Sequence, residues 1–252
     1  MQLNEGGNIW PNAESFDQRH VAQIKQVVDK YLAGTGLEVF PIGSAASPTP
    51  GKISGDLDVL VDLEKTMQLF DSPDSKTARI ELEKFLQTRG LETRRIAVTV
   101  HVLVPFNGTY HQVDIKVVNK PERVAKFHTH SLPQNSPYKG VHKQMMMTAL
   151  AIDKGMLWSP DEGLYKRDSA GKKAEFISDD LDEIAKVLLG PNANGRDFGS
   201  VESILSAIPD PQKRDQIFQN ASTSRSWKPV QVQEAVQFGS SEWFRNLINT
   251  IL

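Results

Sequence analysis

The 252-residue sequence contains no cysteine, which excludes disulfide bonds and metal sites built on thiolates. No apolar run approaches the roughly 20 residues that a membrane-spanning helix needs, and the polar start from Met1 to Gly7 lacks the basic and apolar parts of a signal peptide. With 29 basic against 31 acidic residues, the chain also lacks a general positive field that would attract nucleic acid. We therefore expect a cytoplasmic protein without a membrane partner, and the sequence does not fix its oligomeric state.

Two carboxylates stand on one face of a predicted strand. Asp56 and Asp58 alternate with the apolar Leu57 and Val59, and successive side chains of a strand point to opposite faces of its sheet. The alternation predicts a core on one side of this strand and the two acids on the other.

A third carboxylate, Asp114, lies in a second predicted strand between Val113 and Ile115, and we expect it to face the same cleft. Carboxylates held close together raise one another's pKa unless a cation neutralises them. Hard oxygen ligands favour Mg²⁺ or Mn²⁺, and two such ions can activate an attacking oxygen and stabilise a leaving one. The sequence therefore predicts a metal site made by Asp56, Asp58 and Asp114.

Three motifs follow one another along the chain. The pair Gly43-Ser44 comes first, Ser54-Gly55-Asp56-Leu57-Asp58 follows after a short loop, and Val113-Asp114-Ile115-Lys116 comes later. Their order resembles the polymerase β nucleotidyltransferase superfamily. Residues 138–165 resemble the part of family X DNA polymerases that follows the third aspartate, where an aromatic-x-Gly turn opens a helix, the helix ends at Lys-Gly, and an acidic turn leads to a short strand. The resemblance covers roughly Leu37 to Tyr165.

The resemblance implies an α+β fold, with a nucleotidyltransferase palm of mixed or antiparallel strands and helices on one face, followed by a helical C-terminal region. The charged run that ends at residue 173 predicts a boundary between two parts of the chain. We expect the catalytic core at 1–173 and the helical region at 174–252. The implied activity is metal-dependent transfer of a nucleoside monophosphate from a nucleoside or deoxynucleoside triphosphate to an acceptor hydroxyl, with release of pyrophosphate. Asp56, Asp58 and Asp114 would be catalytic and would hold two Mg²⁺ or Mn²⁺ ions. The expected nucleotide-binding residues are Gly43, Ser44, Lys52, Ser54, Gly55, Lys116, Tyr138 and Lys143.

Apolar periodicity predicts the other elements. One helix is expected after a cap at Ser15, and a hairpin is expected to join a strand at 97–104 to the Asp114 strand through Pro105 to Gly108. Further helices are expected at residues 75–87, 179–189, 201–207, 211–219 and 230–252.

The acceptor stays open between three hypotheses. Similarity after Asp114 favours a nucleic-acid 3′ end, while the single helix expected before Gly43 and the lone Lys52, where family X polymerases carry an arginine pair, favour a minimal or template-independent polymerase. Transfer to a small molecule or a protein side chain is the alternative, and a non-catalytic binding module of the same fold is the third. A basic stripe on the helical tail would favour nucleic acid; its candidates are Lys213, Arg214, Arg225 and Lys228.

Overall fold

The computed structural model describes residues 9–128, 136–223 and 227. The chain forms two compact units, residues 1–130 and 131–252, and each is described by itself. The boundary expected near residue 173 falls inside the second unit, at the first residue of a strand. Among the described residues, no helix has the length and apolar character needed to cross a bilayer.

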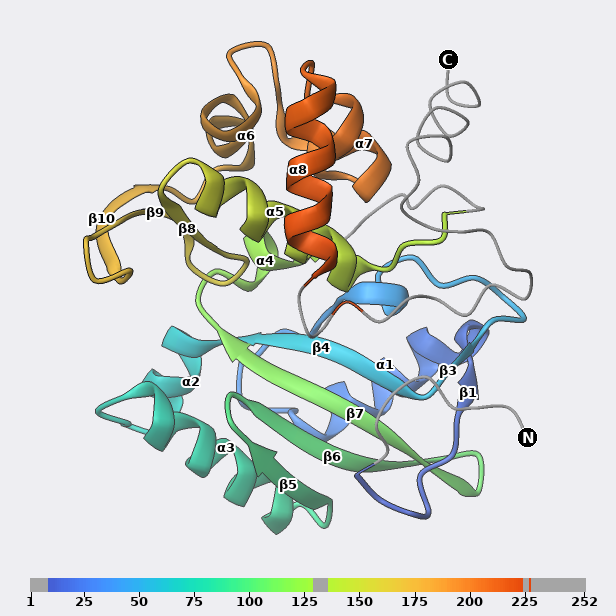
Figure 1. Cartoon of the computed structure of the whole chain (residues 1–252). Helices are drawn as coiled ribbons and strands as arrows, with labels where there is room; N and C mark the ends of the chain where they lie inside the picture. The colour runs from blue at the N-terminus through green and yellow to red at the C-terminus, as the bar shows by residue number, and fades with distance from the viewer. Residues whose placement is uncertain (1–8, 129–135, 224–226, 228–252) are drawn as a thin grey trace. The chain divides into compact units, whose positions relative to one another are not determined.

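Five strands form the main sheet of the first unit, in the order β2-β4-β7-β6-β5 (Figure 1). β4 and β7 run parallel and the other neighbours run antiparallel, so the sheet is mixed and the α+β expectation is confirmed. The strands are β2 (Phe40–Pro41), β4 (Asp56–Asp62), β5 (Glu92–Ile96), β6 (Thr99–Phe106) and β7 (Thr109–Val118). The edge strand β5 was not predicted, because its residues Glu-Thr-Arg-Arg-Ile lack the apolar alternation of a half-buried strand.

Helices cover one face of this sheet, as expected, and form the main core with it. Ile24 and Val28 of α1 (Val21–Tyr31) and Leu82 of α3 (Ser75–Thr88) pack against Leu57 and Val59 of β4 in one buried cluster. α2 (Leu63–Leu69) contributes to the same cluster. The prediction missed α4 (Pro121–His128), whose Val124 packs with Leu60 on the opposite face of β4.

The predicted hairpin between β6 and β7 is confirmed. It turns at Asn107 and Gly108, whose φ values of 52° and 82° are those that tight hairpin turns require at both central positions. Phe106 pairs with Thr109 across the turn, and the same register brings His101 opposite Asp114. The turn therefore determines which β6 side chain lies beside the third acid.

The N-terminal segment is built differently from the expected helix start. Phe16–Asp17 forms a short strand, β1, that pairs with β3 (Ile53–Ser54), and a turn of 3-10 helix, η1 (Gln18–His20), leads into α1. The expected cap at Ser15 was wrong, because the side chain of Asp17 accepts the first free N–H of this turn, from Arg19. Trp10 near the start of this segment is buried against Leu103.

In its described residues, the second unit combines a small sheet with five helical segments. Its antiparallel strands are ordered β10-β9-β8 (Figure 1). The elements are α5 (Gly140–Asp153), β8 (Met156–Ser159), β9 (Gly163–Arg167), β10 (Lys173–Ser178), α6 (Leu181–Leu189), η3 (Gly195–Phe198), α7 (Val201–Ser206) and α8 (Pro211–Ser222). The helices expected here are confirmed up to α8, and the one expected at 230–252 lies outside the described residues. β10 was missed because it is largely exposed and carries no apolar alternation.

Candidate functional site

The three carboxylates lie on one face of the parallel pair β4 and β7. Asp58 pairs directly with Asp114, and Asp56 pairs with Gln112, two residues earlier on the same face. The intervening Leu57 and Val59 are fully buried in the core on the other face. The sequence prediction that the acids share a face is therefore confirmed, and the parallel register places two of them side by side.

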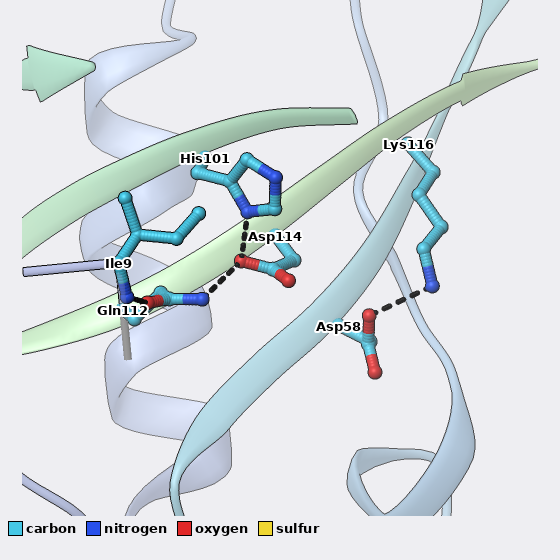
Figure 2. Close-up of polar contacts among 6 residues, drawn as sticks. All are labelled: Ile9, Asp58, His101, Gln112, Asp114 and Lys116. Atoms are coloured by element: carbon cyan, nitrogen blue, oxygen red, sulfur yellow. Dashed lines mark hydrogen bonds and ion pairs between the residues drawn. The ribbon is translucent and has the colours of Figure 1, made fainter. Parts of the chain in front are cut away.

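Asp58 is held by Lys116, a residue predicted to bind nucleotide. The Lys116 amine lies 2.9 Å from Asp58 Oδ1, and each side chain is about a third exposed (Figure 2). Lys116 pairs with Leu60 in the register, so its long side chain reaches back along β4 to the acid. In this structure the lysine supplies the positive charge that faces Asp58.

Asp114 is held by two residues that were not predicted as part of the site. His101 Nδ1 lies 2.7 Å from Asp114 Oδ1, and Gln112 Nε2 donates to the same oxygen at 2.9 Å. The backbone N–H of Ile9 donates to Gln112 Oε1 at 2.8 Å, and this contact fixes which end of the amide faces Asp114. Figure 2 shows the second carboxylate oxygen of Asp114 pointing away from both partners. One oxygen is therefore occupied by the protein while the other is oriented elsewhere.

Asp56 has an altered acidity. Burial raises the pKa of its carboxyl to about 6, the negative charges of Asp58 and Asp114 add to the rise, and Lys116 opposes it. Burial in the sheet face and like charges from two neighbouring acids therefore act in the same direction. A pKa displaced by both causes is typical of functional sites, although structural charges can show it too.

The Gly-Ser pair forms a tight turn beside Asp58. Gly43 begins the 3-10 turn η2 (Gly43–Ala45) with a φ of 61°, a conformation that favours glycine. A side chain at this position would begin 4.0 Å from Asp58 Oδ2, and the N–H of Ile42 donates to the Asp58 carbonyl at 3.0 Å. Ser44, the next residue, is exposed. The structure thus brings the predicted turn next to the predicted acids.

The loop after this turn is tied to the N-terminal segment. Lys52 is exposed, and its carbonyl accepts the N–H of Gln18 at 2.8 Å. Ser54 and Gly55 are buried, and Ser54 Oγ lies 3.3 Å from Ser44 Oγ. The predicted residues Gly43, Ser44, Ser54 and Gly55 are therefore gathered around the start of β4.

Tyr138 and Lys143 belong to the second unit. Both are buried, with 5% and 1% of their surface exposed. Burial lowers the pKa of the Lys143 amine to about 7, and burial together with the charge of Glu202 raises that of the Tyr138 hydroxyl. Their predicted contacts with nucleotide stay predictions.

The three carboxylates offer only oxygen donors, which suits Mg²⁺ or Mn²⁺. In the described part of the chain, however, no three side chains of histidine, cysteine, aspartate or glutamate are arranged as a metal-ligand group. The contacts explain why, because Asp58 is bonded to Lys116 while one oxygen of Asp114 is bonded to His101 and Gln112. The donor chemistry fits a divalent ion, and the protein's own donors hold two of the three acids.

Sequence reasoning could have found His101. Pairing outward from the Asn107-Gly108 turn places it opposite Asp114, so the hairpin signal already contained the contact. Gln112 could also have been predicted, because it lies two residues before Asp114 on the same face of the strand. Nothing in the sequence pattern indicated Gln18, whose contacts with the loop depend on the pairing of β1 with β3.

Comparison with known proteins gives similarity at the level of solved structures. No protein-family model matches the chain, and no curated protein matches it. The polymerase beta of Leishmania infantum in a ternary gap complex is similar with a TM-score of 0.48 and 17% identity, over 74% of this chain and 71% of that one. The same polymerase in a ternary P/T complex is similar with a TM-score of 0.46 and 18% identity, over 75% of this chain and 78% of that one.

Proposed function

We propose that the protein is a metal-dependent nucleotidyltransferase of the polymerase β type. It would move a nucleoside monophosphate from a nucleoside or deoxynucleoside triphosphate to an acceptor hydroxyl and release pyrophosphate. The observation that supports this most is the pairing of Asp58 with Asp114 on parallel strands, with Asp56 on the same face and the Gly43-Ser44 turn beside Asp58.

Asp56, Asp58 and Asp114 would hold two Mg²⁺ or Mn²⁺ ions. Burial, together with the charges of Asp58 and Asp114, raises the pKa of Asp56 to about 6. The charge part of this effect supports the assignment, because divalent cations would relieve the repulsion between the three acids. When bound, the ions would lower the pKa of the acceptor hydroxyl and neutralise charge on the leaving pyrophosphate.

The remaining steps are assigned to the protein's own groups. Asp114 would accept the proton of the acceptor hydroxyl at the oxygen that His101 and Gln112 leave open. The N–H groups and hydroxyl of the Gly43-Ser44 turn, together with Lys52 and the backbone of Ser54 and Gly55, would hold the terminal phosphates, since left-handed glycine turns present backbone N–H groups to anions. Lys116 would keep Asp58 in place until the nucleotide binds.

A nucleic-acid 3′ end is the acceptor that we propose, on the resemblance of residues 138–165 to family X polymerases. The basic stripe adds nothing to this proposal. Lys213 is paired with Asp153, the Arg214 guanidinium donates to the Ile208 carbonyl, and Arg225 and Lys228 lie outside the described residues.

The test is label transfer from each α-labelled nucleotide, with Mg²⁺ or Mn²⁺, to single-stranded and primed DNA and RNA, and to protein with no added acceptor. Asp58→Asn is the inactive variant, and Asp29→Asn, a surface carboxylate paired with Lys25 on α1, is the matched control. Extension of an oligonucleotide by the wild type and the control but not by Asp58→Asn supports the proposal. Label on protein alone would move the acceptor to a protein side chain, and transfer only with added cell metabolites would move it to a small molecule. If no label is transferred under any condition, the proposal is wrong and the hypothesis of a non-catalytic binding module remains.

A further inference from the structure

A buried glutamine, Gln18, lies behind the Gly43-Ser44 turn with both ends of its amide engaged. Gln18 is 1% exposed. The backbone N–H of Thr49 donates to its Oε1 at 2.8 Å, and its Nε2 lies 2.9 Å from Ser54 Oγ. Because a backbone N–H can only donate, it identifies the oxygen end of the amide, and the other end must donate to Ser54. The direction of this hydrogen bond is thus set by the fold.

The hydrogen bond from Gln18 also affects the next hydrogen bond, between Ser54 and Ser44. Ser54 is itself buried, and a buried hydroxyl hydrogen without an acceptor is costly. Its Oγ already accepts from Gln18, and the acceptor in reach among the described residues is Ser44 Oγ at 3.3 Å. Donation from Ser54 to Ser44 is the arrangement that satisfies the buried hydroxyl, and in it the hydrogen of the exposed Ser44 points outward.

We propose that Gln18 is a positioning residue that acts through Ser54 to make the Ser44 hydroxyl a hydrogen-bond donor for the terminal phosphates of a bound nucleoside triphosphate. This inference rests on the proposed function, since it concerns the same turn. An ionised phosphate oxygen accepts hydrogen bonds and cannot donate them. A turn whose hydroxyl hydrogen already points outward is therefore preorganised to bind phosphate, and it disfavours a ligand group that can only donate.

The sharpest test reverses the donor and acceptor roles along the hydrogen bonds from Gln18 to Ser44 without changing the shape of the side chain at position 18. In Gln18→Glu the side chain still accepts from Thr49 but can no longer donate to Ser54, so Ser54 donates to the glutamate and Ser44 donates to Ser54. We expect binding of the triphosphate to weaken about tenfold, the typical effect of losing a hydrogen bond to a charged group. Binding of the matching monophosphate, which lacks the terminal phosphates, is expected to stay unchanged.

A double-mutant cycle separates this role from simple support of the loop. Calorimetry with Mg²⁺ and no acceptor compares each nucleoside triphosphate with its monophosphate in wild type, Gln18→Glu, Ser44→Ala and the double variant. If Gln18 acts through Ser44, the roughly tenfold loss disappears once Ser44 is alanine. Additive losses would mean that Gln18 merely supports the loop, and the proposal would be wrong.

The buried charge of Gln18→Glu can prevent folding, so Ser54→Ala provides a second cycle with Ser44→Ala. It breaks the chain without adding charge, and we expect roughly threefold weaker triphosphate binding that again vanishes in the Ser44→Ala background. Additivity in this cycle also contradicts the proposal. Wild-type protein that binds and transfers nucleotide while both cycles are additive would refute only the role of Gln18. Wild-type protein that binds no nucleoside triphosphate would refute the proposed function and the role of Gln18 with it.

Discussion

Each unit of this protein contains a charged side chain whose burial costs free energy, and the two cases differ in cause. In the first unit Asp56 has a pKa of about 6 because burial acts together with the charges of Asp58 and Asp114. In the second unit Lys143 has a pKa of about 7 because of burial alone. Like charges held together on one sheet face lower the stability of the fold and do not improve its packing. Their presence therefore favours a functional role for these acids. Burial alone favours a core position, so the comparison supports the acids more than it supports Lys143.

The largest expected effect is on catalysis by the first unit. Asp114→Asn keeps the shape of the side chain but removes a charge from the carboxylate set, and we expect nucleotidyl transfer to fall about a thousandfold, as when preorganised electrostatic stabilisation is lost. Steady-state label transfer measures the change, and Asp29→Asn on α1 is the control that should keep the wild-type rate. Equal activity in Asp114→Asn and wild type would contradict the claim that the acids of the first unit form a catalytic site.

The next largest effect is on the stability of the second unit. A lysine whose pKa falls from 10.5 to about 7 on folding is neutral in the folded state at pH values where the unfolded chain binds the proton. Wild-type stability should therefore rise as pH increases from about 7 to 10. Lys143→Met should remove this dependence and raise stability at pH 7 by about 4 kcal/mol.

Tryptophan fluorescence in urea follows this unit, because Trp158, Trp227 and Trp243 come after residue 130 and only Trp10 comes before it. Lys154→Met, an exposed lysine at the end of the same helix, is the control and should keep the wild-type pH dependence. A destabilised Lys143→Met would show that the lysine makes contacts worth more than its burial costs, and the two units would then be alike.

A smaller stability effect of opposite pH sense is expected for Asp56. Its folded pKa of about 6 lies above the ordinary value of 3.8 for an aspartate, so between these values the folded state holds a proton that the unfolded chain has lost. In the absence of divalent cations, stability should fall by about 2 kcal/mol as pH rises from 4 to 6 and change little from this cause above that range.

Asp56→Asn should remove this loss and be more stable than wild type at pH 7, as followed by circular dichroism in urea with a chelator. Mn²⁺ should stabilise the wild type and have less effect on the variant. The control, Asp29→Asn, should follow the wild-type curve. A wild-type curve without the decline would mean that burial and the neighbouring acids do not raise the pKa of Asp56.

The smallest effect is expected at the contacts that orient Asp114. Gln112→Leu removes one of the two donors to Asp114 Oδ1, and outer contacts of this kind typically contribute about tenfold or more to metal affinity. The Mn²⁺ concentration at half-maximal transfer should rise about tenfold, while the exposed Gln87→Leu on α3 should leave it unchanged. An unchanged Mn²⁺ dependence in Gln112→Leu would show that His101 alone orients the acid.

Local sequence patterns predicted much of the first unit. Alternation in β4 and β7 put the acids on one face, and the Asn107-Gly108 turn determined the hairpin register. The patterns failed where burial is slight, as in β5 and β10, because exposed strands need no apolar alternation. They also could not place α4, which covers a corner of the sheet face that the prediction left open.

The sequence by itself determined the three acids, the glycine turn and the hairpin beside them, because periodicity and turn geometry act between residues close in the chain. Only the tertiary structure decided that Asp58 lies opposite Asp114 and that Lys116 reaches back to Asp58. It also decided that Ile9 orients Gln112 and that Thr49 orients Gln18. Ile9 contacts Gln112 across 103 positions and Gln18 contacts Ser54 across 36. Contacts over such separations depend on strand pairing and loop closure, which no local pattern specifies.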